Sequence, residues 1–300
     1  MIRLSLVIAT YNRAEQLMTT LRSVAEQKHP TAEWECVVVD NNSSDDTRHR
    51  VERFAEEHPS LQLHYVFERA QGLSHARNAG IAASRSEVVA FIDDDERIVE
   101  DFVGAYVDFF DKHPEAVAAG GKIVAEYPTG RPKWMSRYAE QPIANPMDFG
   151  REVRRFPSGR IPGGGNMAVR RRLFDEVGVF NTTLGRTGKR LIGGEESELF
   201  ERIADKGYRW YYVPRAVMYH IIPAEKLTDD YFERLALNTG RSQRTRAEVR
   251  GRVASLYVRE IMKWIATLLL CLVHRPAQSR YLIRLRRGIS KGVFQRKEQR

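Results

Sequence analysis

The fold class is decided by the stretch Val88-Val89-Ala90-Phe91-Ile92-Asp93-Asp94-Asp95. Its apolar residues predict a buried strand, and three carboxylates follow directly at the end of that strand. Neighbouring carboxylates repel one another unless a cation lies among them, and oxygen ligands suit Mg²⁺ or Mn²⁺. Acidic runs also occur in solvated loops and in the first turn of helices, but the position of this run after a buried strand favours a metal site.

The segments before and after this stretch alternate between strand and helix patterns. Strands are predicted at residues 4–9, 34–40, 62–67, 88–92 and 116–125, and helices at residues 13–26, 46–57, 72–84 and 99–112. Strands that alternate with helices of about 10–15 residues imply parallel pairing, and near-continuous apolar strands imply a sheet that is covered on both faces. The sequence therefore predicts an α/β fold with a mainly parallel sheet and helices on both faces.

The alternation stops after residue 125. The prolines of residues 126–160 prevent a long helix or a central strand, so this segment is either a functional lid or a surface excursion. Further helices are predicted at residues 170–177, 195–206, 228–250, 253–273 and 280–292, and short strands at residues 208–213 and 216–220. We therefore expect one domain over residues 1–225, with two halves that meet at residue 125, and a helical C-terminal region over residues 226–300.

Polar residues follow three of the predicted strands, where ligands of open α/β sheets bind. The first strand is followed by Thr10-Tyr11-Asn12-Arg13, the second by Asp40-Asn41-Asn42-Ser43 and the fourth by the three aspartates. The sequence contains neither Gly-x-Gly-x-x-Gly nor Gly-x-x-x-x-Gly-Lys-Ser/Thr, which argues against a dinucleotide site and a P-loop. The sequence therefore predicts a largely acidic site at one edge of the sheet.

Charge is distributed unevenly along the chain. The formal net charge is +9, but residues 241–300 contain 16 Lys and Arg and 3 acidic residues, so residues 1–240 carry −4. Basic tails of this kind bind nucleic acid or anionic membranes. Cys36 and Cys271 lie in separate apolar runs, which favours free thiols in a reducing compartment. Because the N-terminus runs straight into a strand and no apolar run reaches the ~18–20 residues of a spanning helix, we expect a cytoplasmic location.

Seven segments, in order along the chain, resemble the family 2 glycosyltransferases of the GT-A fold. The resemblance covers residues 7–13, 38–45, 72–80, 91–95, 164–167, 194–199 and 214–220. It implies an inverting transfer of a sugar from a UDP-sugar or dTDP-sugar to a glycan or lipid-linked acceptor, in polysaccharide or cell-envelope biosynthesis. It makes residues 1–125 the nucleotide-binding half and residues 126–225 the acceptor half. Two alternatives stay open: a nucleotidyl- or phosphotransferase that uses the same aspartates, and a non-catalytic adaptor.

The resemblance also implies roles for individual residues. Contacts to the nucleotide-sugar are expected from Thr10, Tyr11, Asn12, Arg13, Asp40, Asn42, Arg77, Asp93 and Asp94. Asp40 would accept a hydrogen bond from the base, Arg77 would lie near the diphosphate, and Asp93 would hold the ribose. Asp95 and His220 would bind Mn²⁺ or Mg²⁺. Without the resemblance, His220 reads as a packed histidine at a strand end and Arg77 as a solvated charge on a helix.

The acidic pair Glu195-Glu196 matches the position where the family keeps its catalytic base. An inverting transfer needs a carboxylate that takes the proton from the acceptor hydroxyl. Both residues open a helix after Gly193-Gly194, where the helix dipole favours the ionised form. The family more often has Glu-Asp here, so the choice between the two residues is open; we favour Glu196. Two acids that merely open a helix are the alternative.

Two further segments have open interpretations. The glycine-rich loop with Gly164, Gly165 and Asn166 is either a sugar or acceptor contact or a plain tight turn. In the C-terminal region, an apolar surface is predicted from Leu256, Ile261, Trp264, Ile265, Leu268, Leu269, Leu272 and Val273. With its basic flanks this helix suits the interface of an anionic membrane, at its inner face, unless it packs on the catalytic domain. We expect no nucleic acid, because aromatic residues do not interleave with the basic ones.

Overall fold

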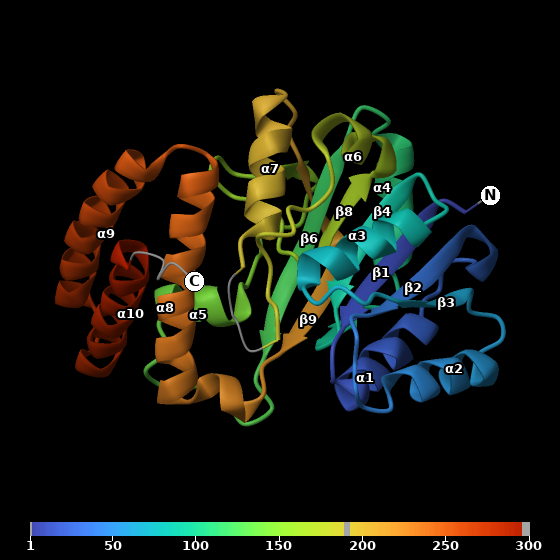
Figure 1. Ribbon diagram of the computed structural model, residues 1–300, viewed down its shortest axis with the longest axis horizontal. Coiled ribbons are helices and arrows are strands. Elements are labelled where there is room, and N and C mark those ends of the chain that lie inside the picture. The colour runs from blue at the N-terminus through green and yellow to red at the C-terminus, as the bar shows by residue number, and fades with distance from the viewer. Residues whose placement is uncertain (1, 189–192, 296–300) are drawn as a thin grey trace. The chain divides into compact units, whose positions relative to one another are not determined.

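The computed structural model describes residues 2–188 and 193–295, and these divide into two compact units (Figure 1). The first unit comprises Met1–Val124, Met147–Thr182 and Glu195–Ile221, and the second comprises Ala125–Pro146, Thr183–Gly194 and Ile222–Arg300. Two segments inside residues 126–225 thus belong to the same unit as the C-terminal helices. The domain boundaries proposed at residues 125 and 225 stay predictions, and residues 296–300 of the basic tail lie outside the described residues.

The first unit is built on one sheet. Its strands follow the order β3 (Leu63–Phe67), β2 (Trp34–Asp40), β1 (Leu4–Thr10), β4 (Val88–Asp93), β8 (Met167–Arg170), β6 (Ala118–Glu126), β9 (Tyr211–Ile221) and β5 (Glu96–Ile98), with β7 (Arg154–Arg155) also paired to β9. The β1–β2, β2–β3 and β1–β4 pairs are parallel, as the alternating sequence predicts. The α/β fold is confirmed.

The strands beyond β4 differ from the sequence prediction. Here the β4–β8, β6–β8, β5–β9 and β7–β9 pairs are antiparallel, so the sheet is mixed. The two short strands predicted at residues 208–213 and 216–220 are one strand, β9. Pro214 interrupts neither of its edge ladders, because β7 pairs with Tyr211 and Tyr212 and β5 pairs with residues 218–220. Strands β5 and β8 are too short to give a period-2 signal.

Helices cover both faces of this sheet, as predicted. The unit contains α1 (Ala14–Ala25), η1 (Thr31–Glu33), α2 (Thr47–Glu57), α3 (Leu73–Ala83), α4 (Phe102–Lys112), α6 (Arg171–Val177) and α7 (Glu195–Asp205). On one face, Leu6 and Ile8 of β1 join a core with α1, α2 and α4. On the other face, Val7 joins a core with α3, α6 and α7. The side chains of β1 therefore alternate between two apolar layers, which fixes the strand register at the carboxyl edge.

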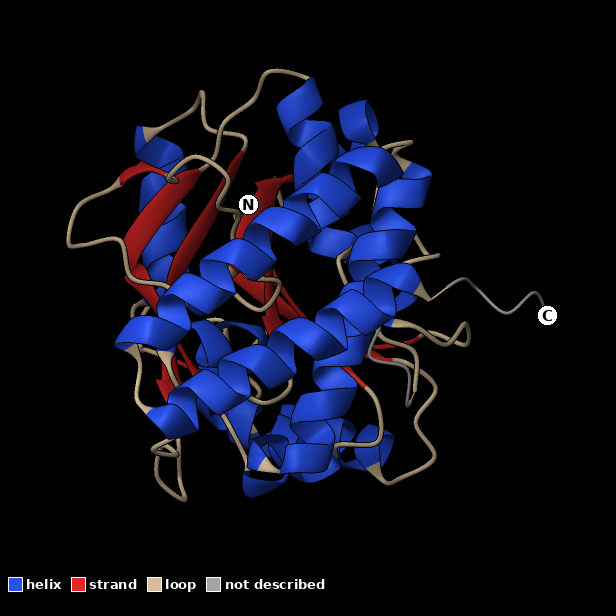
Figure 2. Cartoon of the chain, turned by 90° about the vertical axis from the view of Figure 1, so that its left-hand side faces the viewer, coloured by secondary structure: helices blue, strands red, loops and turns tan. Residues whose placement is uncertain are grey.

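The second unit is helical. It contains α5 (Arg137–Ala144), η2 (Ala224–Leu227), α8 (Asp229–Val249), α9 (Val253–Val273) and α10 (Pro276–Phe294). Figure 2 shows the long helices of this unit alongside one another. Helix α10 begins at Pro276 rather than at residue 280, because proline is well tolerated in the first helical turn. Helices α8 and α10 cross closely at Gly240, where an added Cβ would overlap the backbone oxygen of Ile289.

Candidate active site

The polar residues that follow the parallel strands meet at one edge of the sheet. The strand register sets Thr10 of β1 opposite Asp40 of β2, and Ala9 opposite Asp93 of β4. This placement follows from the parallel pairing, since parallel strands end on the same side. The three segments that the sequence singles out for nucleotide binding are therefore neighbours.

Asp40 is buried and held in a defined orientation. Its Oδ2 accepts a hydrogen bond from the Tyr65 hydroxyl at 2.8 Å, and its Oδ1 accepts one from the backbone N–H of Ser43 at 2.8 Å. Burial and the adjacent Asp40 carboxylate raise the pKa of Tyr65, so this tyrosine remains a neutral donor. Sequence reasoning missed Tyr65, because a lone tyrosine in a predicted strand carries no signal of its own.

The turn after β1 is tied to the loop after β2. The Asn12 side-chain oxygen accepts hydrogen bonds from the backbone N–H groups of Ser44 at 2.7 Å and Asp45 at 3.3 Å, and the backbone N–H of Asn12 donates to the Ser43 hydroxyl. Asn12 and Asn42 both have a positive φ, 51° and 67°. Asparagine tolerates this left-handed conformation better than most residues. The two asparagines therefore shape the rim of the candidate nucleotide site.

Asp94 points into the protein and has internal partners. Its carboxylate accepts hydrogen bonds from Thr10 Oγ1 at 2.8 Å and from Arg13 Nη1 at 2.9 Å. Burial raises the pKa of Asp94 to about 6, although the Arg13 guanidinium opposes this shift. Arg13 also lies 3.2 Å from Asp95 Oδ2. Asp94 thus joins the first and fourth strand ends, and the predicted contact of this residue with the nucleotide-sugar stays a prediction.

Asp95 and His220, to which the resemblance assigns metal binding, lie close together. His220 Nε2 is 3.8 Å from Asp95 Oδ1, and the backbone N–H of Ile221 donates to the Asp95 carbonyl at 3.2 Å. Within residues 2–188 and 193–295, no group of three or more His, Cys, Asp or Glu side chains is arranged to hold a metal ion. Mg²⁺ and Mn²⁺ sites in enzymes commonly use one or two protein ligands, and substrate phosphates supply the rest. One carboxylate and one imidazole fit such a site.

Arg77 forms a buried cluster with two acids. Its side chain is 3% exposed; Nη1 lies 2.9 Å from Glu195 Oε1, and Nη2 lies 3.1 Å from Asp93 Oδ1. Burial opposes the charged form, but the carboxylates of Asp93, Glu195 and Glu196 outweigh it and raise the pKa of Arg77. Arg77 is therefore not a solvated helix charge. It fixes the start of α7 to the end of β4.

The structure separates the two glutamates that the sequence leaves as alternatives. Glu195 is buried and bound to Arg77. Glu196 is half-buried. The Oε2 atom of each glutamate is covered and has no hydrogen-bond partner among the described residues, so this feature does not distinguish the two. They differ in burial and in the contact of Glu195 with Arg77, and the assignment of the general base to Glu196 stays a prediction.

Glu96 is a site residue that sequence reasoning missed. It is buried directly after the three aspartates, and its Oε2 accepts a hydrogen bond from the backbone N–H of Asp93 at 2.8 Å. Burial, followed by repulsion from Asp93 and Asp95, raises the pKa of Glu96 well above its ordinary value. The fourth acid of the run was the available signal, but a sequence does not distinguish a buried carboxyl from a solvated one.

The glycine-rich loop packs against these groups. A Cβ at Gly164 would lie 2.8 Å from Arg77 Nη2, and a Cβ at Gly165 would overlap the Glu96 carboxyl group. Asn166 is fully buried; its amide donates to the carbonyl oxygens of Lys122 and Ala216, each at 3.0 Å, and its Oδ1 accepts from the Tyr106 hydroxyl at 2.6 Å. The loop thus supports the buried acids, and its predicted contact with a sugar or acceptor stays a prediction.

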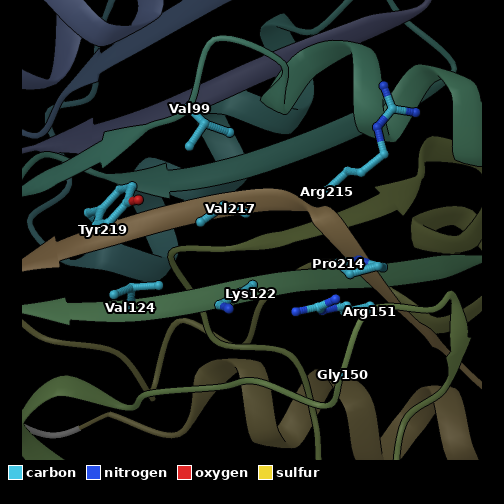
Figure 3. A pocket seen from close by; sticks show the side chains of 9 residues that line it. All are labelled: Val99, Lys122, Val124, Gly150, Arg151, Pro214, Arg215, Val217 and Tyr219. Carbon is cyan, nitrogen blue, oxygen red and sulfur yellow. The ribbon is translucent and has the colours of Figure 1, made fainter.

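A separate hollow of about 400 Å³ lies on the first unit, between β6 and β9 (Figure 3). It is lined by Val99, Lys122, Val124, Gly150, Arg151, Pro214, Arg215, Val217 and Tyr219. Side chains alternate along a strand, so Tyr219 of this hollow and His220 project to opposite faces of β9. Arg215 pairs with Asp101 and Asp108, and Lys122 pairs with Asp148. Two of its cations are therefore paired with acids, and the hollow lies on the face of β9 opposite to His220.

A mixed sheet with acids at the ends of its parallel strands is the arrangement expected of the GT-A fold. The chain matches the family described as "Glycosyl transferase family 2" over residues 5–178, more than half of its length. The chain therefore belongs to glycosyl transferase family 2, and it is a transferase.

Curated and solved relatives agree with this assignment. The chain is similar to the glucosyl-dolichyl phosphate glucuronosyltransferase of Haloferax volcanii, with 29% identity over 228 residues, 73% of this chain and 69% of the relative. Alignments with the next two curated relatives span 41% and 42% of those proteins.

Two solved structures share the fold. One is the mannosyltransferase PcManGT from Pyrobaculum calidifontis in complex with GDP-Man and Mn²⁺ (TM-score 0.57, 22% identity, 96% of this chain and 87% of that one). The other is S. aureus TarS 1–349 in complex with UDP (TM-score 0.56, 18% identity, 96% and 90%). Both neighbours carry a nucleotide or nucleotide-sugar, and this likeness supports the fold of the present chain.

Proposed function

We propose that this enzyme transfers a sugar, with inversion at the anomeric carbon, from a UDP-sugar or dTDP-sugar to a glycan or lipid-linked acceptor of polysaccharide or cell-envelope biosynthesis. One observation carries the proposal: Glu195 is buried and bound to the Arg77–Asp93 pair, whereas Glu196, the next residue, is half-buried and close enough to help raise the pKa of Arg77. A single displacement needs one base and one charge-stabilised leaving group, and these residues supply candidates for both.

In this proposal Glu196 is the base. It takes the proton of the acceptor hydroxyl while that oxygen attacks the anomeric carbon, and the bond from that carbon to the diphosphate breaks on the opposite side. Glu195 is a positioning residue, because its carboxylate is bound to Arg77. Arg77 in turn holds Asp93 and adds positive charge near the place where the diphosphate leaves.

Donor binding is proposed for the strand edge. Asp40, oriented by Tyr65 and Ser43, is placed to accept a hydrogen bond from the base. The rim of the site would enclose the nucleoside, and Asp93 would accept a hydrogen bond from the ribose. This rim consists of Thr10, Tyr11, Asn12, Arg13 and Asn42. The UDP in one structural neighbour supports the uracil form, whereas the GDP-Man in the other shows that the fold also accepts a purine.

Asp95 and His220 are proposed as the ligands of Mn²⁺ or Mg²⁺. When bound, such an ion neutralises charge on the diphosphate. Arg13 lies 3.2 Å from Asp95 and keeps one oxygen of that carboxylate oriented. The Mn²⁺ in the Pyrobaculum relative supports use of a divalent cation.

We further propose that the enzyme works as a peripheral protein at the inner, cytoplasmic face of the cell membrane. The net charge of +13 in residues 241–300 supports this location, because basic segments are attracted to anionic lipid surfaces. A lipid-linked acceptor would be presented at the same surface. Among the described residues, no helix is both long and apolar enough to cross a bilayer.

The transfer is tested with a panel of UDP-, dTDP- and GDP-sugars, each with and without Mn²⁺. We expect release of the nucleoside diphosphate from one uridine or thymidine donor, and a product of inverted anomeric configuration by NMR. Release of pyrophosphate or transfer of phosphate would instead make the chain a nucleotidyl- or phosphotransferase. A product that retains the donor configuration would contradict the single displacement.

A further inference from the structure

One side of α9 is apolar and uncovered. Eight large apolar side chains of this helix are between 48% and 80% exposed: Val258, Ile261, Met262, Ile265, Leu268, Leu269, Leu272 and Val273. We call these eight residues the α9 face. Contiguous exposed apolar patches on soluble proteins mark sites of interaction with another protein or with a membrane.

The α9 face is a single stripe, because its members recur at helical spacings of three and four residues. The opposite side of the helix is packed: Leu256, Glu260 and Thr267 are buried. Trp264 is half-buried, and its Nε1 donates to the Ser290 hydroxyl at 2.8 Å. The sequence prediction that Leu256 belongs to the exposed surface is therefore wrong, because Leu256 is buried in the helical core of the second unit. Trp264 is only partly exposed and is bound to α10 through Ser290.

The charges beside this stripe have one sign. The only acid of α9, Glu260, is 1% exposed and binds Arg286 and Ser290, so it does not add negative charge to the surface. Helix α10 contains no acid at all. Arg259 and Lys263, both exposed, lie on α9, and exposed Arg275 follows its end. An apolar stripe on a helix whose exposed charges, like those of α10, are all basic complements an anionic lipid surface.

We infer that the α9 face lies in the interfacial layer of an anionic bilayer, with the helix parallel to the membrane plane. The inference rests on the proposed peripheral location and names the surface responsible for it. A transmembrane orientation would carry Arg259 and Lys263 into the hydrocarbon, which is costly. A second copy of the chain is a poorer occupant, because two α9 faces in contact would bring two basic borders together.

The test uses the full chain and sedimentation with vesicles of phosphatidylcholine, with or without phosphatidylglycerol. We expect binding to the phosphatidylglycerol vesicles and partial release by high salt. The double variant Ile265→Gln/Leu269→Gln should weaken binding by at least about tenfold, since it removes buried apolar area from the membrane contact. Val153→Gln, which changes an exposed valine of the first unit, is the matched control and should bind like the unchanged chain.

Each outcome of this test either supports or overturns the membrane contact of the α9 face. If the unchanged chain ignores anionic vesicles, both the peripheral location and the inference fall. If it binds and the double variant binds equally well, only the inference falls, and the basic residues alone explain the location. A lipid-free dimer that the double variant dissociates would make the face a contact between copies and would overturn the lipid assignment. Thermal unfolding and turnover of a water-soluble acceptor should be the same for both variants, which separates this test from that of the transfer reaction.

Discussion

The carboxyl edge of the parallel strands and the α9 face differ in which side chains they bury and which they expose. At the strand edge, charged groups are buried and paired: Arg77 with Glu195 and Asp93, and Asp94 with Arg13. On α9, apolar groups are exposed and unpaired. Burying charge is expensive unless it is paired, and exposing apolar area is unfavourable unless it is covered. Each region thus departs from an ordinary protein interior or surface, and the departure supports the binding site that is proposed for it.

The largest effect is expected from Asp95→Ala at the strand edge. Loss of one of two proposed cation ligands should lower turnover by about a thousandfold or more, because the charge on the departing diphosphate is then poorly neutralised. Stability should change little, and vesicle binding not at all. Steady-state kinetics over a Mn²⁺ titration measures the effect. Normal turnover by Asp95→Ala would remove this residue from the cation site.

The second substitution alters the packing of the helices that support α9 and leaves the residues of the α9 face unchanged. Gly240→Val places a side chain where α8 and α10 touch backbone to backbone, so the helices must separate. Overpacking of this kind costs about 1–3 kcal/mol in the free energy of unfolding. Denaturant unfolding should show the loss, with vesicle binding reduced in parallel. Ala247→Val is a control for added volume at a buried site of α8 that already has a side chain.

The smallest effect is expected at Trp264, a residue of α9 that does not belong to the α9 face. Trp264→Phe removes the hydrogen bond to Ser290 but keeps most of the apolar ring. We expect a loss of about 1 kcal/mol in stability, the usual net value of one hydrogen bond. Because Trp264 is half-buried and directed to Ser290 of α10, vesicle binding should be unchanged. A clear loss of vesicle binding in a folded Trp264→Phe variant would place the tryptophan in the membrane contact after all.

Much of the strand edge was predictable from the sequence, because it follows from local patterns. The run Asp93-Asp94-Asp95 follows an apolar strand directly, so the local sequence alone predicts acids at that edge. The sequence does not show what each acid contacts. Asp94 turns inward to Arg13, and Glu96 is buried beneath Gly165, through contacts between residues about 70–80 positions apart in sequence.

The mixed half of the sheet and the α9 face were harder to predict for the same physical reason. Strands β5 and β8 are defined by their pairing with distant strands, because they are too short to show an alternation of apolar and polar residues in the sequence. On α9, apolar residues occur all around the helix, so sequence alone does not say which side is covered. The packing of the neighbouring helices decides it: Leu256 is buried, Trp264 is half-buried and bound to Ser290 of α10, and Leu268 and Leu272 are exposed.

In the proposed mechanism Glu196 is the base, and Glu195 holds Arg77. The most direct test measures kcat and donor affinity for Glu196→Gln and Glu195→Gln side by side. Glu196→Gln should lower kcat by ~10²–10⁴-fold with unchanged donor affinity, because an amide keeps the shape of the acid but takes no proton. Glu195→Gln should weaken the buried pair, lower the free energy of unfolding by about 3 kcal/mol and leave more residual turnover than Glu196→Gln does. An active Glu196→Gln beside a folded but inactive Glu195→Gln would reverse the two roles and contradict the account.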